Sequence, residues 1–277
     1  MTPRLLTAGD NVVDCYPDLG EMFPGGNTVN VAVHAQRNGA SAAYLGVLGT
    51  DEAGDLLRKA LADEGVDTSL TRTAPGPNAF AVVRVVDGNR VFEDADVGIS
   101  RFTVTEEDLR KVADADLVHT GECSMLEDDL GRLAGAARIL SFDFSERPWD
   151  YVVEYAHHAS IAILSAASTE EDPAALARRV AQFGPGTVVV TQGASGATML
   201  VNGRVLQAPA GTGPVVDTLG AGDAFIARLL VGIMRGEESQ LLLSAATSYA
   251  TKTCAEYGAF GYRADLPQPF PPVSVAG

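Results

Sequence analysis

A glycine-rich stretch near the C-terminus combines the residue types that phosphate chemistry requires. Residues 215–227 read Val-Val-Asp-Thr-Leu-Gly-Ala-Gly-Asp-Ala-Phe-Ile-Ala, a loop of small residues that opens a helix. Glycines let backbone N–H groups approach a ligand closely. The first N–H groups of a helix have no partner within it, and they carry positive potential. We therefore predict an anion site, suited to a phosphoryl group, formed by the backbone of Gly220, Ala221 and Gly222.

Asp223 lies in the first turn of this predicted helix. A carboxylate repels a phosphate beside it, so its natural task is to accept the proton of an acceptor hydroxyl. We expect the helix N-terminus to lower the pKa of Asp223. A weak base suffices, because the proton can leave late in a loose phosphoryl-transfer transition state. A lone acidic residue in a first helical turn is an ordinary feature, but the whole string favours a catalytic base.

The elements that must position these groups alternate along the chain. We predict strands at residues 5–8, 42–46, 117–119, 139–144, 161–164 and 187–191. We predict helices at residues 29–36, 52–63, 173–183, 222–236 and 239–254. Such alternation is typical of a parallel sheet covered by helices.

A hairpin interrupts this alternation. Residues 80–86 and 90–92 flank the pair Asp87-Gly88, which favours a tight hairpin turn. We interpret the hairpin, together with strands from residues 11–22, as a small β lid over the sheet. Residues 267–277 are proline-rich and are expected to form an extended tail.

Composition narrows the class of protein. In 277 residues, 20 Lys and Arg against 36 Asp and Glu give a net charge of −16. That sign disfavours nucleic acid or an anionic membrane as a partner. We find no apolar run that suits a signal peptide or a membrane span. The cysteines, Cys15, Cys123 and Cys254, are odd in number and far apart, which predicts a reducing, cytoplasmic location.

The string from Asp217 to Phe225 resembles the C-terminal signature of the ribokinase-like (phosphofructokinase-B) carbohydrate kinases. The resemblance implies an α/β fold, a ribokinase-like three-layer sandwich with a small β lid. We expect one domain, residues 1–277, with lid segments at about 11–24 and 78–100. It also implies Asp223 as the base, the 220–222 backbone as the anion hole, and ATP and Mg²⁺ as cofactors.

Residues 25–32, Gly-Gly-Asn-Thr-Val-Asn-Val-Ala, resemble the sugar motif of the same family. Gly26 leaves room for a sugar at the backbone, and Asn30 and Asp14 offer polar groups to hydroxyls, which both donate and accept. For Asp14 alone, a solvated turn residue is an equal interpretation. The implied substrate site consists of Asp10, Asp14, Gly25, Gly26, Asn27 and Asn30.

Residues 191–197, Thr-Gln-Gly-Ala-Ser-Gly-Ala, resemble the T-x-G-x-x-G nucleotide segment of the family. The family often has an N-x-x-E stretch near magnesium, but residues 164–171 contain no Asn. Glu170 or Glu171 could act on the ion through water, and its ligands stay open. The implied nucleotide residues are Thr191, Gly193, Gly196, Asp217 and Thr218.

Within the family, the sequence resembles the fructoselysine 6-kinases at residues 9–17, 25–32, 89–92 and 142–145. This resemblance implies phosphorylation of the 6-hydroxyl of a fructosamine (Amadori) substrate by ATP. The acidic lid residues Glu93, Asp94 and Asp96 would suit its cationic amines. A solvated hairpin end explains these residues equally well.

Several alternatives stay open. A kinase of the same family that acts on fructose, ribose or adenosine fits the same motifs. An inactive sugar-binding regulator fits the fold but not the intact Asp223 and its glycine loop. A dinucleotide oxidoreductase or a P-loop kinase is disfavoured because G-x-G-x-x-G after the first strand and G-x-x-x-x-G-K-[ST] are both missing. We expect sugar and ATP as partners, and a homodimer formed through the lid.

Overall fold

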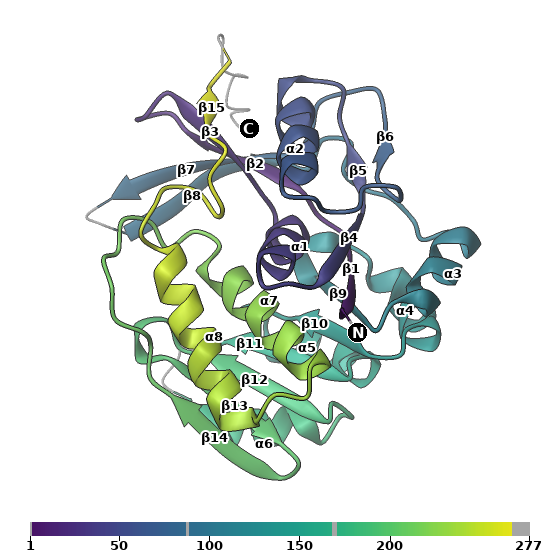
Figure 1. Ribbon diagram of the computed structural model, residues 1–277, viewed down its shortest axis with the longest axis vertical. Helices are drawn as coiled ribbons and strands as arrows, with labels where there is room; N and C mark the ends of the chain where they lie inside the picture. Colours follow the sequence, from purple (N-terminus) through teal and green to yellow (C-terminus); the bar gives the residue numbers. More distant parts are fainter. Residues whose placement is uncertain (1, 87–88, 168–170, 268–277) are drawn as a thin grey trace.

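A sheet of eight strands forms the centre of the structure, a computed structural model that describes residues 2–86, 89–167 and 171–267 (Figure 1). Its order is β14-β13-β12-β11-β10-β9-β1-β4. The pairs from β4 to β12 are parallel, whereas β13 and β14 each run antiparallel to the strand before them. The strands span Arg4–Ala8 (β1), Ser41–Leu45 (β4), Leu117–Gly121 (β9), Leu140–Asp143 (β10), Ile161–Ser165 (β11), Thr187–Thr191 (β12), Ala197–Val201 (β13) and Arg204–Ala208 (β14).

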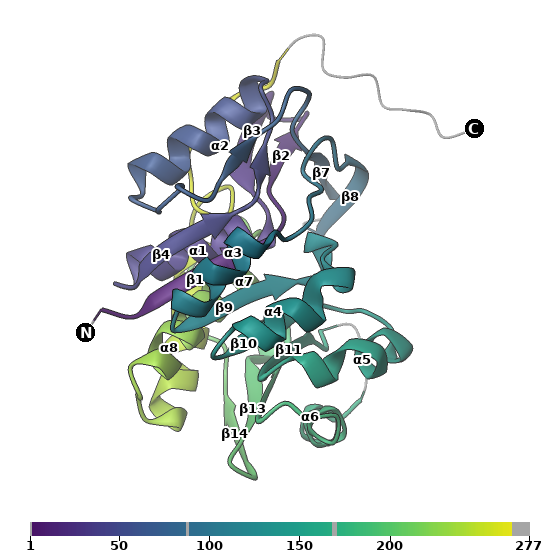
Figure 2. The same ribbon diagram turned by 90° about the vertical axis from the view of Figure 1, so that its right-hand side faces the viewer.

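Helices cover both faces of this sheet, so the molecule has three layers (Figure 2). On one face α1 packs against α7 and α7 packs against α8, while α6 lies on β12 on the other. Within the described residues, no helix is both long and apolar enough to cross a membrane. The helices span Asn27–Arg37 (α1), Glu52–Asp63 (α2), Glu106–Asp114 (α3), Leu130–Ala136 (α4), Trp149–Tyr155 (α5), Pro173–Ala181 (α6), Ala221–Met234 (α7) and Ser239–Thr253 (α8).

Helix α1 begins two residues earlier than predicted, at Asn27. Gly26 precedes it with a φ of 102°, which a residue with a Cβ rarely adopts. The carboxylate of Asp10 accepts the backbone N–H groups of Asn27 (2.7 Å) and Thr28 (3.3 Å). The cap of α1 is therefore a residue that follows β1, which no local helix signal indicates.

A second sheet, here called the lid sheet, has the order β15-β3-β2-β7-β8. Four of its strands come from the two segments predicted to form a lid. The fifth, β15, was not predicted, because its two residues precede a proline-rich end; it pairs antiparallel with β3. Most of the predicted tail, residues 268–277, lies outside the described residues. The strands span Val12–Tyr16 (β2), Glu21–Gly25 (β3), Phe80–Val86 (β7), Asn89–Asp96 (β8) and Ala264–Asp265 (β15).

Candidate active site

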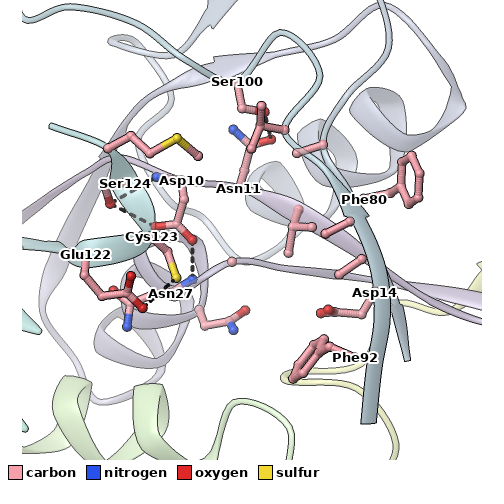
Figure 3. Close-up of a pocket in the computed structure, with 18 of the residues that line it drawn as sticks. Asp10, Asn11, Asp14, Asn27, Phe80, Phe92, Ser100, Glu122, Cys123 and Ser124 are labelled. Carbon is pink, nitrogen blue, oxygen red and sulfur yellow. Dashed lines mark hydrogen bonds between the residues drawn. The ribbon is translucent and has the colours of Figure 1, made fainter. Parts of the chain in front are cut away.

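A cavity of about 450 Å³ lies between the lid sheet and the end of the main sheet (Figure 3). Its walls include residues that directly follow β1 and β9, residues of lid strands β2, β7 and β8, and the first turns of α1 and α7. The carboxyl ends of parallel strands are the usual ligand site in an open α/β sheet. The topology therefore directs side chains from distant parts of the sequence into one pocket.

Asp223 lines this cavity from the first turn of α7. Asn27 Nδ2 donates a hydrogen bond to its Oδ1 (2.8 Å), and Asn30 Nδ2 donates to its Oδ2 (2.7 Å). Both amides belong to the first turn of α1, which packs against α7. The structure thus brings the predicted base together with two predicted sugar residues.

The pKa of Asp223 is raised to about 8, so the expectation of a lowered pKa was wrong. Burial is the largest cause, and the nearby carboxylates of Asp143 and Asp10 raise it further. Hydrogen bonds from Asn30 and Asn27 oppose the rise. The expectation considered the helix N-terminus alone, whereas desolvation and like charges dominate here. A base with this pKa is poised near neutral pH, where general-base catalysis is most effective.

A second carboxyl group beside Asn27, that of the half-buried Asp143, was not predicted. Asp143 is the last residue of β10, and Asn27 Nδ2 also donates to its Oδ2 (3.0 Å). Burial raises the pKa of Asp143 to about 7, and Glu122 and Asp10 raise it further. One carboxamide therefore bridges Asp143 and Asp223. The signal in the sequence was the position of Asp143 at the carboxyl end of a parallel strand.

The predicted sugar residues fit closely around the start of α1. Asp14 on β2 points into the cavity (Figure 3). A Cβ on Gly25 would lie 2.2 Å from Asp14 Oδ2, and one on Gly26 would lie 2.7 Å from Asn11 Cα. Both positions therefore need glycine for this close approach. Five of the six predicted substrate residues line the cavity, all but Gly25: Asp10, Asp14, Gly26, Asn27 and Asn30.

The side-chain oxygen of Asn30 is suited to accept a hydrogen bond from a ligand. Asn30 Nδ2 donates to Asp223, but Asn30 Oδ1 is buried and has no hydrogen-bond donor among the described residues. A buried acceptor without a donor costs about 1–3 kcal/mol. A hydroxyl group in the cavity would supply that donor.

The predicted anion loop adopts a conformation that depends on glycine. Gly220 has a φ of 71°, and a Cβ there would lie 2.5 Å from the Cβ of Ala259. The Ala221 N–H donates to Thr218 O (3.2 Å), so it is already engaged. The Gly222 N–H has no acceptor among the described residues and lies in the first turn of α7. Of these two N–H groups, that of Gly222 is the one open to an anion.

The predicted nucleotide residues after β12 do not line the cavity. Thr191 ends β12, and Gly193 begins the 3₁₀ turn Gly193–Ser195 that follows it. Gly196 has a φ of 102°, and a Cβ there would lie 2.1 Å from Ala208 O. This loop thus leaves the carboxyl end of β12, at the same edge of the main sheet as the cavity.

Asp217 and Thr218 differ in exposure. Thr218 is exposed, whereas Asp217 is buried. The carboxylate of Asp217 accepts hydrogen bonds from the Tyr16 hydroxyl (3.0 Å), the Gly258 N–H (2.9 Å) and the Leu219 N–H (3.1 Å). Asp217 therefore ties the lid strand β2 to the loop that precedes α7.

Three charged residues of the cavity were not singled out in the sequence: Arg101, Glu122 and Arg147. Glu122 follows β9, and its carboxylate pairs with the Arg147 guanidinium (2.7 Å). Arg101 has no ion pair among the described residues. Against these two arginines stand five lining carboxylates, so the cavity is acidic: Asp10, Asp14, Asp96, Glu122 and Asp223.

The acidic lid residues only partly match the predicted amine site. Glu93 pairs with Arg84 (2.5 Å), and neither Glu93 nor Asp94 lines the cavity. Asp96 does line it, and its Oδ1 accepts the Gly98 N–H (2.8 Å). The prediction was wrong for Glu93 and Asp94, because the first already has a cationic partner and both lie outside the pocket wall.

Residues 10–262 match the family model described as pfkB family carbohydrate kinase. The chain belongs to this family, as its motifs predicted. It is therefore a phosphotransferase that uses an alcohol group of a carbohydrate as acceptor.

Two relatives resemble the chain over most of its length. The fructosamine kinase FrlD of Bacillus subtilis (strain 168) is 37% identical over 266 residues, which cover 94% of this chain and 93% of that protein. The fructoselysine 6-kinase of Escherichia coli (strain K12) is 35% identical over 259 residues, which cover 92% of this chain and 99% of that protein.

Solved structures confirm the predicted fold class. The ribokinase of Arabidopsis thaliana, solved with ribose and ATP, matches with a TM-score of 0.82 at 23% identity, covering 96% of each chain. A fructokinase from Xylella fastidiosa with bound ATP matches with a TM-score of 0.76 at 22% identity, covering 95% of each chain. The chain thus has the ribokinase-like α/β fold, a three-layer sandwich with a small β lid.

Proposed function

We propose that this protein transfers the γ-phosphoryl group of ATP to the 6-hydroxyl of a fructosamine. One observation carries the chemistry: a carboxylate of raised pKa, Asp223, lies in the cavity beside the N-terminus of α7. The substrate class rests on the two relatives named for fructosamine and fructoselysine, each at least 35% identical over most of the chain.

The residues of the cavity divide the work. Asp14 and the open Oδ1 of Asn30 bind sugar hydroxyls, while Asp223 receives the proton of the reacting hydroxyl. The hydroxyl oxygen forms a bond to the γ-phosphorus as the bond from that phosphorus to the β-phosphate bridging oxygen breaks. ADP leaves with the electron pair of the broken bond, and no covalent enzyme intermediate forms. The Gly222 N–H and the dipole of α7 stabilise the charge on the transferring group.

We propose that ATP lies along the loop after Thr191, with Gly193, Gly196 and the exposed Thr218 beside it. Among the described residues, no group of three or more His, Cys, Asp or Glu side chains could hold a metal ion. We propose that Mg²⁺ is held chiefly by the phosphate oxygens of ATP and by water, as is usual for that ion in kinases. When bound, Mg²⁺ would neutralise charge on the phosphates.

The charge of the cavity supports a cationic substrate. Asp96 lines it without being part of the base, and it offers a carboxylate to the amine of a fructosamine. A plain sugar or a nucleoside brings no positive charge to this acidic wall, so fructose, ribose and adenosine are the weaker candidates.

We further propose a homodimer formed through the lid sheet and a cytoplasmic location. Leu19 and Phe92, both on the lid, are exposed apolar side chains, and a second lid could cover them. Sedimentation of the wild type and of a Leu19→Lys variant tests the dimer. A monomeric wild type would contradict it.

The test of the function is ADP release with Mg-ATP and a panel of fructoselysine, other fructosamines, fructose, ribose and adenosine. Asp223→Asn is the blank. We expect the highest kcat/KM with a fructosamine. A preference for a plain sugar or a nucleoside would keep the kinase and reject the fructosamine assignment. Sugar binding without any ADP release would favour the inactive regulator.

A further inference from the structure

The carboxamide of Asn27 joins three functional groups at the base of the cavity. Its Nδ2 lies 2.8 Å from Asp223 Oδ1 and 3.0 Å from Asp143 Oδ2. Its Oδ1 lies 3.1 Å from His119 Nε2. On the far side of the imidazole, His119 Nδ1 lies 3.2 Å from Ser141 Oγ. The side chain of Asn27 therefore has a partner for each of its two N–H groups and one for its oxygen.

The hydrogen bonds of Asn27 to the two carboxyl groups determine which atoms donate in the hydrogen bonds from Asn27 through His119 to Ser141. Asn27 Nδ2 donates to one carboxyl oxygen of Asp143 and to one of Asp223, so both of its hydrogens point at these two residues. Asn27 Oδ1 then faces His119 and needs a donor, so His119 Nε2 carries a hydrogen. His119 is wholly buried, and burial lowers its pKa to about 3, so the ring is neutral. Its Nδ1 is then bare and accepts the hydroxyl hydrogen of Ser141.

We propose that His119 is a positioning residue for the catalytic base. Its Nε2–H holds the Asn27 carboxamide with both amide hydrogens directed at Asp223 and Asp143. The strand register supports this arrangement, because His119 on β9 pairs with Ser141 on β10. The proposal rests on the proposed role of Asp223, whereas the hydrogen-bond chain itself does not.

Loss of the Nε2–H donor would leave Asn27 Oδ1 without its hydrogen bond to the protein. The carboxamide would then turn away, and Asp223 would lose a donor that favours its ionised form. The titratable groups that face Asp223 are Asp143 and Asp10, from the ends of β10 and β1, and both disfavour ionisation. The pKa of the base would therefore rise.

Two variants of nearly equal polarity separate positioning from general stability. In His119→Gln the side-chain NH₂ can reach the place of Nε2 and donate to Asn27. In His119→Asn the shorter side chain reaches only toward Ser141. We expect His119→Asn to lower kcat about tenfold. We also expect it to shift the acid limb of the pH profile of kcat/KM upward by about half a unit to one unit.

His119→Gln should keep kcat within about threefold of the wild type and leave the acid limb in place. His157→Asn, on an exposed histidine that does not line the cavity, is the matched control and should change neither quantity. Equal losses of kcat in His119→Gln and His119→Asn, with no shift of the acid limb of the pH profile, would indicate that His119 serves only stability. That result would overturn the proposal.

A second measurement does not depend on activity. Nitrogen-15 spectra of the four histidine side chains, with His119 assigned by its loss in His119→Gln, report the tautomer directly. We expect a neutral ring with hydrogen on Nε2 from pH 5 to 9. A ring with hydrogen on Nδ1, or a charged ring near neutral pH, would overturn the proposal even if Asp223→Asn is inactive. Conversely, a fully active Asp223→Asn would reject the base and leave the tautomer result standing.

Discussion

Replacement of Asp223 by Asn is expected to abolish turnover and yet to stabilise the folded protein. The pKa of this carboxyl is raised from an ordinary value of 3.8 to about 8. The folded protein thus favours the protonated form, while the unfolded chain releases the proton near its ordinary pKa. The contribution of Asp223 to the free energy of unfolding therefore falls as the pH rises from 3.8 to about 8. It stays constant above that pH.

The size of the effect follows from these two values and the local hydrogen bonds. A shift of about four units corresponds to about 6 kcal/mol above pH 8, and partial exposure of the carboxyl reduces this to about 3 kcal/mol. An amide at position 223 cannot accept from both Asn27 and Asn30, which costs about 1 kcal/mol. Asp223→Asn should therefore be about 2 kcal/mol more stable than the wild type at pH 8 and about 1 kcal/mol less stable near pH 4.

Urea unfolding of the two proteins from pH 4 to 8.5, without sugar or nucleotide, measures this difference. Asp128→Asn, on an exposed carboxylate, is the matched control and should show no change of this kind. ADP release should fall about a hundredfold or more in Asp223→Asn. A variant that is less stable than the wild type at pH 8 would refute the electrostatic reasoning. A variant with normal turnover would refute the assignment of the base.

Three further predictions concern the loop, the sugar and the substrate tail. Gly220→Ala should lose about 2 kcal/mol of stability or more, since it combines a φ of 71° with a Cβ contact of 2.5 Å. Gly222→Ala, whose Cβ meets nothing within 4 Å, should gain up to about 1 kcal/mol; thermal melts compare the two. Asn30→Ala should lower kcat/KM for the sugar about tenfold or more without changing KM for ATP, measured by initial rates. Arg101 lines the cavity and has no ion pair among the described residues, so its guanidinium can bind a carboxylate of the substrate. Arg101→Met should therefore raise KM about tenfold for a fructosamine that carries a carboxylate, but not for fructose; equal effects on both would contradict this.

Much of this site could be predicted because its parts lie in short local strings. The glycine loop and Asp223 occupy one helix start, and Gly26, Asn27 and Asn30 occupy another. Alternation of strands and helices predicts a parallel sheet, whose carboxyl edge gathers such starts. Neither segment of sequence indicates that α1 packs against α7. That contact brings the side-chain amides of Asn27 and Asn30 to Asp223.

The residues that were not assigned to the site from the sequence depend on which strands are neighbours. Asp143 and His119 become part of the site because β10 lies beside β9, in a register that pairs Asp143 with Gly121. Nothing within residues 117–121 or 140–143 indicates that register. The strand β15 joins the lid for a similar reason, through a pairing of Ala264 with Met22 across almost the whole chain.

The raised pKa of Asp223 also changes the account of how the base works. A carboxyl with a lowered pKa would be ionised at neutral pH but would hold a proton only weakly. Burial and the carboxylates of Asp10 and Asp143 increase its proton affinity, while the amides of Asn27 and Asn30 keep enough of it ionised to act. Stronger hydrogen-bond donors than these two amides would lower the pKa of Asp223 and make it too weak a base. Weaker donors would leave it protonated at neutral pH. The balance arises only where the lid, α1 and the ends of β1 and β10 meet, so a change in any of these should move the pH optimum before it stops the reaction.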